Sequence, residues 1–194
     1  MYHPSLDEIK AQAGTGSLIP IYRSINADLE TPVSAYLKVA KPPYSFLLES
    51  VTGGESIGRY SFIGTEPYRV LKTGPGEEFG EVDPLTLVQE EMERHKLIPV
   101  PGLPRFHGGG VGYLAYDTIH YFEPRVPTMS EDPQGLPESV FMFSDTLLIF
   151  DHVRHDIKIV SHIRLNGDLD TEYSKAVSKI DELAERLAKP LELP

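Results

Sequence analysis

The sequence of 194 residues contains no cysteine. This absence excludes disulfide bonds, thiolate metal sites, iron–sulfur clusters and cysteine nucleophiles. No segment approaches the run of roughly 20 apolar residues that a membrane-spanning helix needs. Residues 1–8 are polar and acidic, which is not the pattern of a secretory signal peptide. We therefore expect a cytoplasmic protein without a membrane partner.

Positive charge is also scarce in this chain. Lys and Arg number 18 against 29 Asp and Glu, which gives a net charge of −11 and a pI near 5.0. Such a chain repels the phosphate backbone of nucleic acids, so we expect no nucleic-acid partner. Hydrophobic residues make up 40% of the chain and charged residues 24%, which is typical of a globular protein.

Helical patterns recur along the chain. Thr31 with Pro32, and Asp83 with Pro84, are typical of the first residues of a helix. Apolar residues at helical spacing support helices over residues 4–13, 32–40, 84–96 and 170–188. The helix over 84–96 is expected to pack an apolar stripe inside the protein and to turn its glutamates, Glu91 among them, toward solvent. This stripe consists of Leu85, Leu87, Val88 and Met92.

Short strand patterns lie between these helices. Residues 18–23 are expected to form an edge strand, because Pro20 has no amide proton to donate. Residues 44–50 are typical of a core strand, and residues 139–150 and 157–165 predict a β-hairpin around 151–156. This mixed order favours an α+β fold, with a mainly antiparallel sheet packed with helices, in one domain over residues 1–194.

A glycine-rich segment spans His107–Gly112. It is not a dinucleotide-binding fingerprint, because Tyr113 stands where the third glycine of G-x-G-x-x-G is needed. We interpret the segment as a strand onto which a bulky side chain or another backbone packs closely. Asp117, which follows it, is expected to cap a short helix that has Glu123 at its far end.

A serine esterase is the alternative from another enzyme class. Gly54–Gly58 matches the nucleophile motif G-x-S-x-G with Ser56 as the nucleophile, and His107–Gly110 matches an oxyanion-hole motif. The order of the two motifs is reversed relative to α/β-hydrolases, and a strand pattern follows Ser56 where a helix is needed. Both features argue against this alternative.

Three histidines, His152, His155 and His162, lie near the predicted hairpin. His152 and His155 span the predicted turn, and His162 lies on the return strand. No cysteine and no H-E-x-x-H motif accompanies them, so we interpret them as a solvated turn and not as a metal site. No metal site is predicted in this chain.

Three ordered segments carry a more specific signal. Leu47–Ser50 reads L-L-E-S, Arg59–Gly64 reads R-Y-S-F-I-G, and Phe106–Asp117 contains G-G-x-x-G-Y-x-x-Y-D. Their order and spacing resemble the N-terminal region of anthranilate synthase component I, a chorismate-utilising enzyme family, from about Ile21 to Arg164. L-L-E-S favours this family over the alternative, 4-amino-4-deoxychorismate synthase component I.

The resemblance implies a function for the whole enzyme. Members of the family convert chorismate and glutamine or ammonia to anthranilate and pyruvate in tryptophan biosynthesis, use Mg²⁺, and are feedback-inhibited by tryptophan. The catalytic residues and the Mg²⁺ ligands lie in a C-terminal chorismate-binding domain of roughly 250 residues, which this chain lacks. The implied partners are that domain, a glutamine amidotransferase subunit (component II) and L-tryptophan. We expect no catalytic residue and no bound cofactor in this chain, which alone should be inactive.

The resemblance also implies a tryptophan-binding site. The L-L-E-S segment lines the inhibitor pocket in the family, which assigns Leu48, Glu49 and Ser50 to it, and the following strand adds Arg59 and Tyr60. Glu49 and the Ser50 hydroxyl can accept hydrogen bonds from the ammonium group of the inhibitor, and Arg59 can face its carboxylate. Tyr60 and Leu48 can form an apolar wall for the indole. We name these five residues the effector site.

Overall fold

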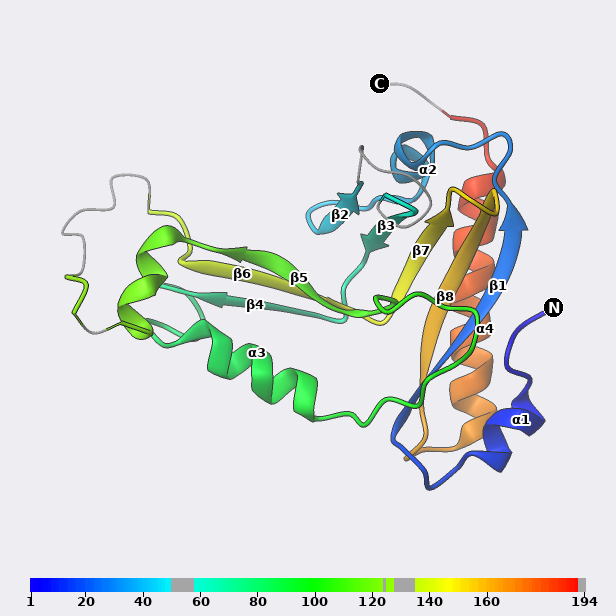
Figure 1. Cartoon of the computed structure of the whole chain (residues 1–194), viewed down its shortest axis with the longest axis horizontal. Helices are drawn as coiled ribbons and strands as arrows, with labels where there is room; N and C mark the ends of the chain where they lie inside the picture. The colour runs from blue at the N-terminus through cyan, green and yellow to red at the C-terminus, as the bar shows by residue number, and fades with distance from the viewer. Residues whose placement is uncertain (50–57, 124, 128–134, 192–194) are drawn as a thin grey trace. The chain divides into compact units, whose positions relative to one another are not determined.

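The computed structural model describes residues 1–49, 58–123, 125–127 and 135–191 (Figure 1). Its helices are α1 (Leu6–Ala11), α2 (Pro32–Val39), α3 (Pro84–Glu93), α4 (Leu169–Ala188) and the 3₁₀ helix η1 (Tyr116–Tyr121). Its strands are β1 (Leu18–Asn26), β2 (Ser45–Leu48), β3 (Tyr60–Thr65), β4 (Arg69–Thr73), β5 (Gly109–Leu114), β6 (Ser139–Ser144), β7 (Thr146–Asp151) and β8 (Asp156–Arg164). Neighbouring strands pair in the antiparallel direction, which confirms the expected α+β class.

The chain folds into two compact units. The larger unit comprises residues 1–67, 95–108 and 144–194, and the smaller unit comprises residues 68–94 and 109–143. The larger unit contains a five-stranded sheet in the order β1-β8-β7-β3-β2, and the smaller unit contains a three-stranded sheet in the order β4-β6-β5. One domain over the whole chain stays a prediction.

Helix α4 covers one face of the five-stranded sheet (Figure 1). Its buried residues recur at helical spacing, namely Ala176, Ile180, Leu183 and Leu187. They belong to one core cluster with fully buried isoleucines of β1 and β8, namely Ile19, Ile21, Ile157, Ile159 and Ile163. Burying each large aliphatic side chain contributes about 1.5–3 kcal/mol, so this layer is the main hydrophobic core. The apolar face predicted for the helix over 170–188 is confirmed.

Capping residues fix where the helices of the larger unit begin. Ser5 caps α1 and Thr31 caps α2, each in a reciprocal capping box with the residue three positions later. Asp168 accepts a hydrogen bond of 3.1 Å from the backbone N–H of Thr171 at the start of α4. Such a cap stabilises a helix by about 1 kcal/mol. The helix start expected at Thr31 and Pro32 is confirmed, whereas the cap at Asp168 was not expected from the sequence.

The opposite face of the five-stranded sheet carries a second, smaller apolar cluster. Its fully buried residues are Leu147, Ile149 and Val160, and the side chains of Tyr22, Tyr60, Phe62 and Leu103 pack against them. Leu103 belongs to residues 95–108, so this segment covers part of that face.

Asp145 interrupts the strand expected over residues 139–150. The residues before Asp145 form β6 in the three-stranded sheet, and the residues after it form β7 in the five-stranded sheet. Strands β7 and β8 pair as a hairpin, which confirms the predicted hairpin around 151–156. Strand β1 is an edge strand as expected, whereas β2, expected in the core, is the opposite edge.

Helix α3 of the smaller unit buries a charge where an apolar stripe was expected. Glu91 is 3% exposed and forms ion pairs with Arg69 of β4 and with Arg94. Leu85 and Met92 remain 43% and 51% exposed. The expected burial of these two apolar residues and the exposure of Glu91 are therefore wrong, because β4 presents a guanidinium group to this side of the helix.

The glycine-rich segment allows close contacts, as predicted. A Cβ atom on Gly112 would lie 1.9 Å from the carbonyl oxygen of Val140 on β6, and one on Gly108 would lie 2.5 Å from the ring of His162. The role expected for Asp117 is wrong, because Ala115 occupies the N-cap of η1 and makes no side-chain cap.

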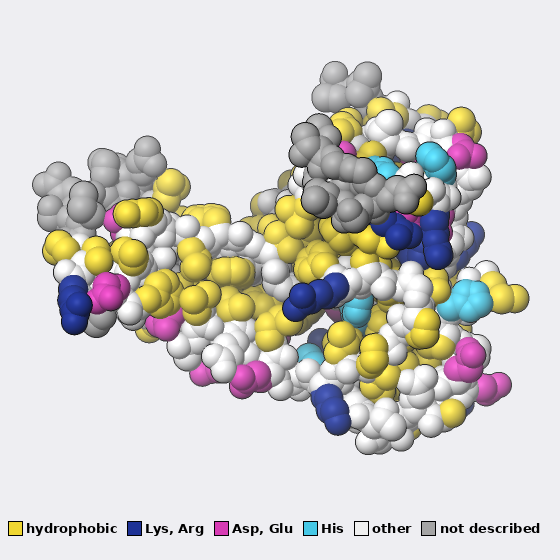
Figure 2. All heavy atoms as spheres, in the orientation of Figure 1, with side chains coloured by type: hydrophobic (Ala, Val, Ile, Leu, Met, Phe, Trp, Pro, Cys, Tyr) yellow, Lys and Arg dark blue, Asp and Glu magenta, His cyan; other side chains and the backbone are white. Residues whose placement is uncertain are grey.

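Hydrophobic side chains also reach the surface of the smaller unit, and Figure 2 shows them gathered along its sheet. Tyr113 of β5, Tyr116 and Leu136 are among the large exposed ones. None of the helices in the described residues is both long and apolar enough to cross a membrane.

Candidate functional site

Strands β2 and β3 bring two residues of the predicted effector site, Leu48 and Tyr60, to one face of the larger sheet. Leu48, the last residue of β2, lies opposite Phe62 of β3, and Tyr60 lies opposite Asp151 of β7. Residues directly opposite each other, and residues two apart on one strand, share a face of a sheet. Leu48, Phe62 and Tyr60 therefore lie on the face opposite α4, at its β2 edge.

Aromatic rings line this edge. The rings of Tyr60 and Phe62 lie 6.2 Å apart, and Phe106 meets Phe62 edge to face at 5.1 Å. Such aromatic pairs add about 0.5–1.5 kcal/mol beyond the burial of their area, so each ring holds its neighbour in place. We name Tyr60, Phe62 and Phe106 the aromatic surface.

The Arg59 guanidinium lies beside this surface. Its Nε donates to Oδ1 of Asp151 at 3.0 Å, and its Nη2 donates to Oδ2 at 2.7 Å. The centre of the guanidinium lies 5.0 Å from the centroid of the Tyr60 ring, which is cation–π distance. A positive charge thus lies over an aromatic ring at the edge of the sheet.

Asp151 is the buried partner in this ion pair, with its side chain only 2% exposed. Burial alone raises the pKa of a carboxyl group, but hydrogen bonds from Arg59 and from the backbone N–H of Arg154 outweigh it, so the pKa of Asp151 lies below its ordinary value. The pair therefore stays ionised at neutral pH.

The five residues of the effector site differ in where the structure places them. Leu48 and Tyr60 share a face of the sheet, the Arg59 guanidinium lies over the Tyr60 ring, and Glu49 is exposed directly after β2. Ser50 lies outside the described residues. The binding role of all five residues stays a prediction.

Sequence reasoning missed two residues of this region, Phe106 and Asp151. Both lie far in sequence from the residues they contact, and only the strand register brings Asp151 next to Tyr60. An aspartate that begins a four-residue turn is a local signal for Asp151, because its carboxylate often accepts hydrogen bonds from the turn.

The histidines near the hairpin have three different environments. His155 is exposed in the turn, and His152, also exposed, shares a hydrogen bond of 2.8 Å with the Ser61 hydroxyl. His162 is half-buried: its Nδ1 lies 2.9 Å from the carbonyl oxygen of Asp145, and its Nε2 lies 3.1 Å from Nδ1 of His107. The interpretation as a solvated turn is therefore wrong for His162.

The structure offers little support for a serine hydrolase. Ser56 lies outside the described residues, and strand β3 begins at Tyr60, where the nucleophile motif needs a helix. The hydroxyl of Ser61, which contacts His152, belongs to a residue that is 1% exposed. A substrate carbonyl has no access to that hydroxyl.

Within the described residues, no group of three or more His, Asp or Glu side chains is arranged to hold a metal ion. The described residues thus do not fit a Mg²⁺ site.

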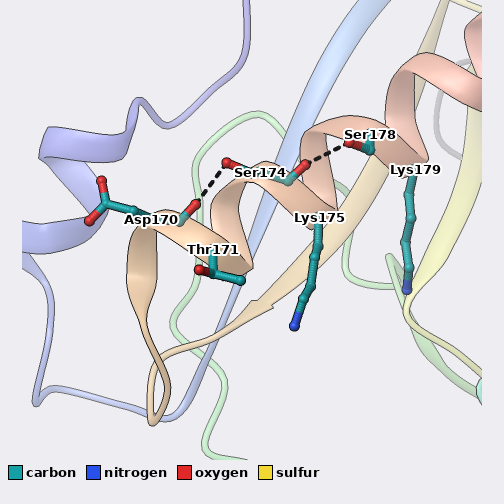
Figure 3. Close-up of a pocket in the computed structure, with 6 residues that line it drawn as sticks. All are labelled: Asp170, Thr171, Ser174, Lys175, Ser178 and Lys179. Atoms are coloured by element: carbon teal, nitrogen blue, oxygen red, sulfur yellow. Dashed lines mark hydrogen bonds between the residues drawn. The ribbon is translucent and has the colours of Figure 1, made fainter.

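A shallow depression follows the outer side of α4 (Figure 3). The hydroxyl groups of Ser174 and Ser178 donate to carbonyl oxygens of the same helix, and Lys175 and Lys179 form ion pairs with Glu172 and Asp145. Its polar groups are satisfied within the protein, so the depression is not a candidate ligand site.

Comparison with known proteins shows to which family the chain is similar. A family model described as chorismate binding enzyme matches residues 43–193. A probable anthranilate synthase component 1 from Schizosaccharomyces pombe is 45% identical over 99% of the chain, and the Acetivibrio thermocellus anthranilate synthase component 1 is 40% identical over 93%. The crystal structure of anthranilate synthase component I from Streptococcus pneumoniae TIGR4 aligns over 86% of the chain, with a TM-score of 0.54 and 25% identity.

The matched proteins are much longer than this chain. The chain spans 39%, 38% and 37% of their respective lengths. The family match, in contrast, covers most of the chain, because it begins just before β2 and extends past the end of α4. The chain therefore belongs to the family of chorismate binding enzymes.

Proposed function

We propose that this chain is the N-terminal regulatory and scaffolding part of an anthranilate synthase component I. The whole enzyme converts chorismate and glutamine or ammonia to anthranilate and pyruvate, in the cytoplasm, as a step of tryptophan biosynthesis. This chain contributes part of the feedback site for L-tryptophan, at Leu48, Glu49, Ser50, Arg59 and Tyr60.

The observation that supports the regulatory role is that the Arg59 guanidinium lies over the Tyr60 ring, on a sheet face that also includes Leu48. A free aromatic amino acid has a carboxylate, an ammonium group and a flat apolar ring. The guanidinium matches the carboxylate, and the aromatic surface matches the ring. The exposed Glu49 carboxylate can pair with the ammonium group.

The proposed partners follow from the length of the relatives. The remaining three fifths of such a protein would supply the chorismate-binding catalytic domain and the Mg²⁺ ligands. Exposed side chains on the smaller unit, such as Tyr113, Tyr116 and Leu136, form an apolar surface that a further domain can cover. The name component 1 in the relatives implies a component 2, the amidotransferase that delivers ammonia.

Calorimetric titration of L-tryptophan into the full-length enzyme tests the regulatory role. We expect saturable binding by the wild type and a loss of affinity of about 5- to 150-fold in Ser50→Phe, because the larger side chain enters the proposed site. The matched control is Ser178→Phe, which makes the same change on the exposed side of α4 and should leave the affinity unchanged. Wild-type protein that does not bind L-tryptophan, or an affinity unaffected by Ser50→Phe, contradicts the proposal.

A further inference from the structure

We propose that Asp151 is a positioning residue of the effector site, because it holds the Arg59 guanidinium over the Tyr60 ring with its remaining N–H groups available to a ligand carboxylate. The inference rests on the proposed function, since it requires an amino-acid effector at this surface. It adds to that function a residue that does not itself touch the ligand.

The geometry of the ion pair fixes the orientation of Arg59. Two parallel hydrogen bonds, from Nε and Nη2 to the two oxygens of Asp151, set the plane of the guanidinium. An arginine has about five N–H donors, so both donors of Nη1 and one of Nη2 remain after these two bonds. The Arg59 side chain is 30% exposed, so part of the group reaches solvent.

Asp151 is itself held rigidly by the hairpin turn. Its Oδ1 accepts hydrogen bonds from the backbone N–H groups of Val153 and Arg154, both at 3.2 Å. The backbone N–H of His152 donates to the carbonyl oxygen of Arg59 at 2.9 Å. The hairpin turn therefore holds Arg59 in two ways. The N–H of His152 binds the backbone of Arg59, and Asp151, itself bound to the turn, binds the side chain.

Replacing Asp151 by asparagine removes the bidentate ion pair with Arg59 and changes the shape of the side chain only slightly. One carboxylate oxygen becomes an NH₂ group, which cannot accept a hydrogen bond and faces the N–H donors of Arg59. The guanidinium then loses its bidentate partner and leaves the Tyr60 ring. Binding of a carboxylate ligand should weaken, while stacking of an aromatic ring on the surface should persist.

The test compares two ligands on the full-length enzyme by calorimetry. L-tryptophan carries the carboxylate, and L-tryptophan amide lacks it but keeps the indole and the ammonium group. We expect Asp151→Asn to weaken L-tryptophan binding about tenfold or more and to change binding of the amide by no more than about twofold. Asp151→Glu, which keeps a carboxylate, should recover most of the L-tryptophan affinity.

A matched control is available on the neighbouring strand. Asp156 lies directly opposite Asp151 in the β7–β8 pair, and its carboxylate binds Lys158, with both contacts at 2.8 Å. Asp156→Asn removes the same charge from the same face but no hydrogen bond to Arg59, so it should change the affinity for either ligand by no more than about twofold. Thermal unfolding of each variant shows whether it folds.

The outcomes separate this inference from the proposed function. An equal loss for both ligands in Asp151→Asn, or an equal loss in Asp156→Asn, overturns the positioning role. The same holds if a folded Asp151→Glu binds L-tryptophan no better than Asp151→Asn. Wild-type enzyme that does not bind L-tryptophan overturns the proposed function instead.

Discussion

The pair His107–His162 makes the stability of the protein depend on pH. The carbonyl oxygen of Asp145 can only accept a hydrogen bond, so Nδ1 of His162 carries the proton. Its Nε2 is then the acceptor for Nδ1–H of His107. A second proton on His162 would set two N–H donors against each other and break this contact.

The environment of His162 disfavours that second proton. Desolvation, together with the neighbouring His107 and Lys179, lowers the pKa of His162 from 6.5 to about 4, although the Asp145 carbonyl and carboxylate act in the opposite direction. Burial also lowers the pKa of His107. In the folded protein, both rings are therefore neutral at neutral pH.

The direction of the pH effect follows from these pKa values. Below pH 6.5 the unfolded chain binds a proton at His162 that the folded chain does not bind, so the free energy of unfolding falls as the pH falls. The decrease from this group ends near pH 4, where the folded protein also takes up the proton. A shift of about 2.5 units at about 1.4 kcal/mol per unit gives between about 3 and 4 kcal/mol. Part of the His162 side chain reaches solvent, so this value is an upper bound.

Urea unfolding of the wild type and of His162→Gln at several pH values between 4 and 7, at constant ionic strength, measures this effect. The variant keeps a neutral polar group but cannot titrate, and both proteins share the contribution of the carboxylates. We expect the free energy of unfolding of the wild type to fall by up to about 3–4 kcal/mol more than that of the variant between pH 6.5 and 4. Parallel pH profiles of the two proteins would refute the reasoning.

Two further predictions concern the smaller unit. Gly112→Ala should lower the free energy of unfolding by about 3 kcal/mol or more in urea titrations, because the new Cβ would lie 1.9 Å from the Val140 carbonyl oxygen. Gly167→Ala, where the nearest atom lies at 3.6 Å, is the control, and equal losses in the two variants would contradict the packing argument. Glu91→Gln should cost about 2 kcal/mol by the same measurement, because it removes the charge that pairs with Arg69. The exposed Glu90→Gln should cost almost nothing, and an effect as large as that of Glu91→Gln would show that burial is not the cause.

The sequence predicted those parts of the fold that local signals specify. The apolar spacing of α4 and the caps at Thr31 and Asp83 act within a few residues, so the starts of α2 and α3 and the buried face of α4 could be inferred. The hairpin of β7 and β8 follows from the same kind of local pattern.

The errors arise where distant residues decide the outcome. Asp145 looks like any residue within a continuous strand pattern, yet the chain changes sheets there. Glu91 is buried because Arg69, 22 positions away, pairs with it. The spacing of apolar residues along a helix does not predict an ion pair with a residue of a distant strand.

The candidate site shows the same division. The motifs pointed to Leu48, Arg59 and Tyr60. The strand register brings Leu48 and Tyr60 to one face of the sheet, and the Arg59 guanidinium lies over the Tyr60 ring. Asp151 is 92 positions from Arg59, and Phe106 reaches Phe62 from another segment. Pairings of this kind depend on register and on the path of residues 95–108, neither of which the sequence specifies locally.

The measurement that tests the central claim most directly is the turnover of chorismate by this chain alone. With chorismate, Mg²⁺ and a high concentration of ammonium, we expect no anthranilate fluorescence above the no-protein control. The full-length enzyme should produce anthranilate under the same conditions, and L-tryptophan should inhibit it. Turnover by the 194-residue chain well above the control would show that it carries its own active site. That result would contradict its assignment as the regulatory part of a larger enzyme.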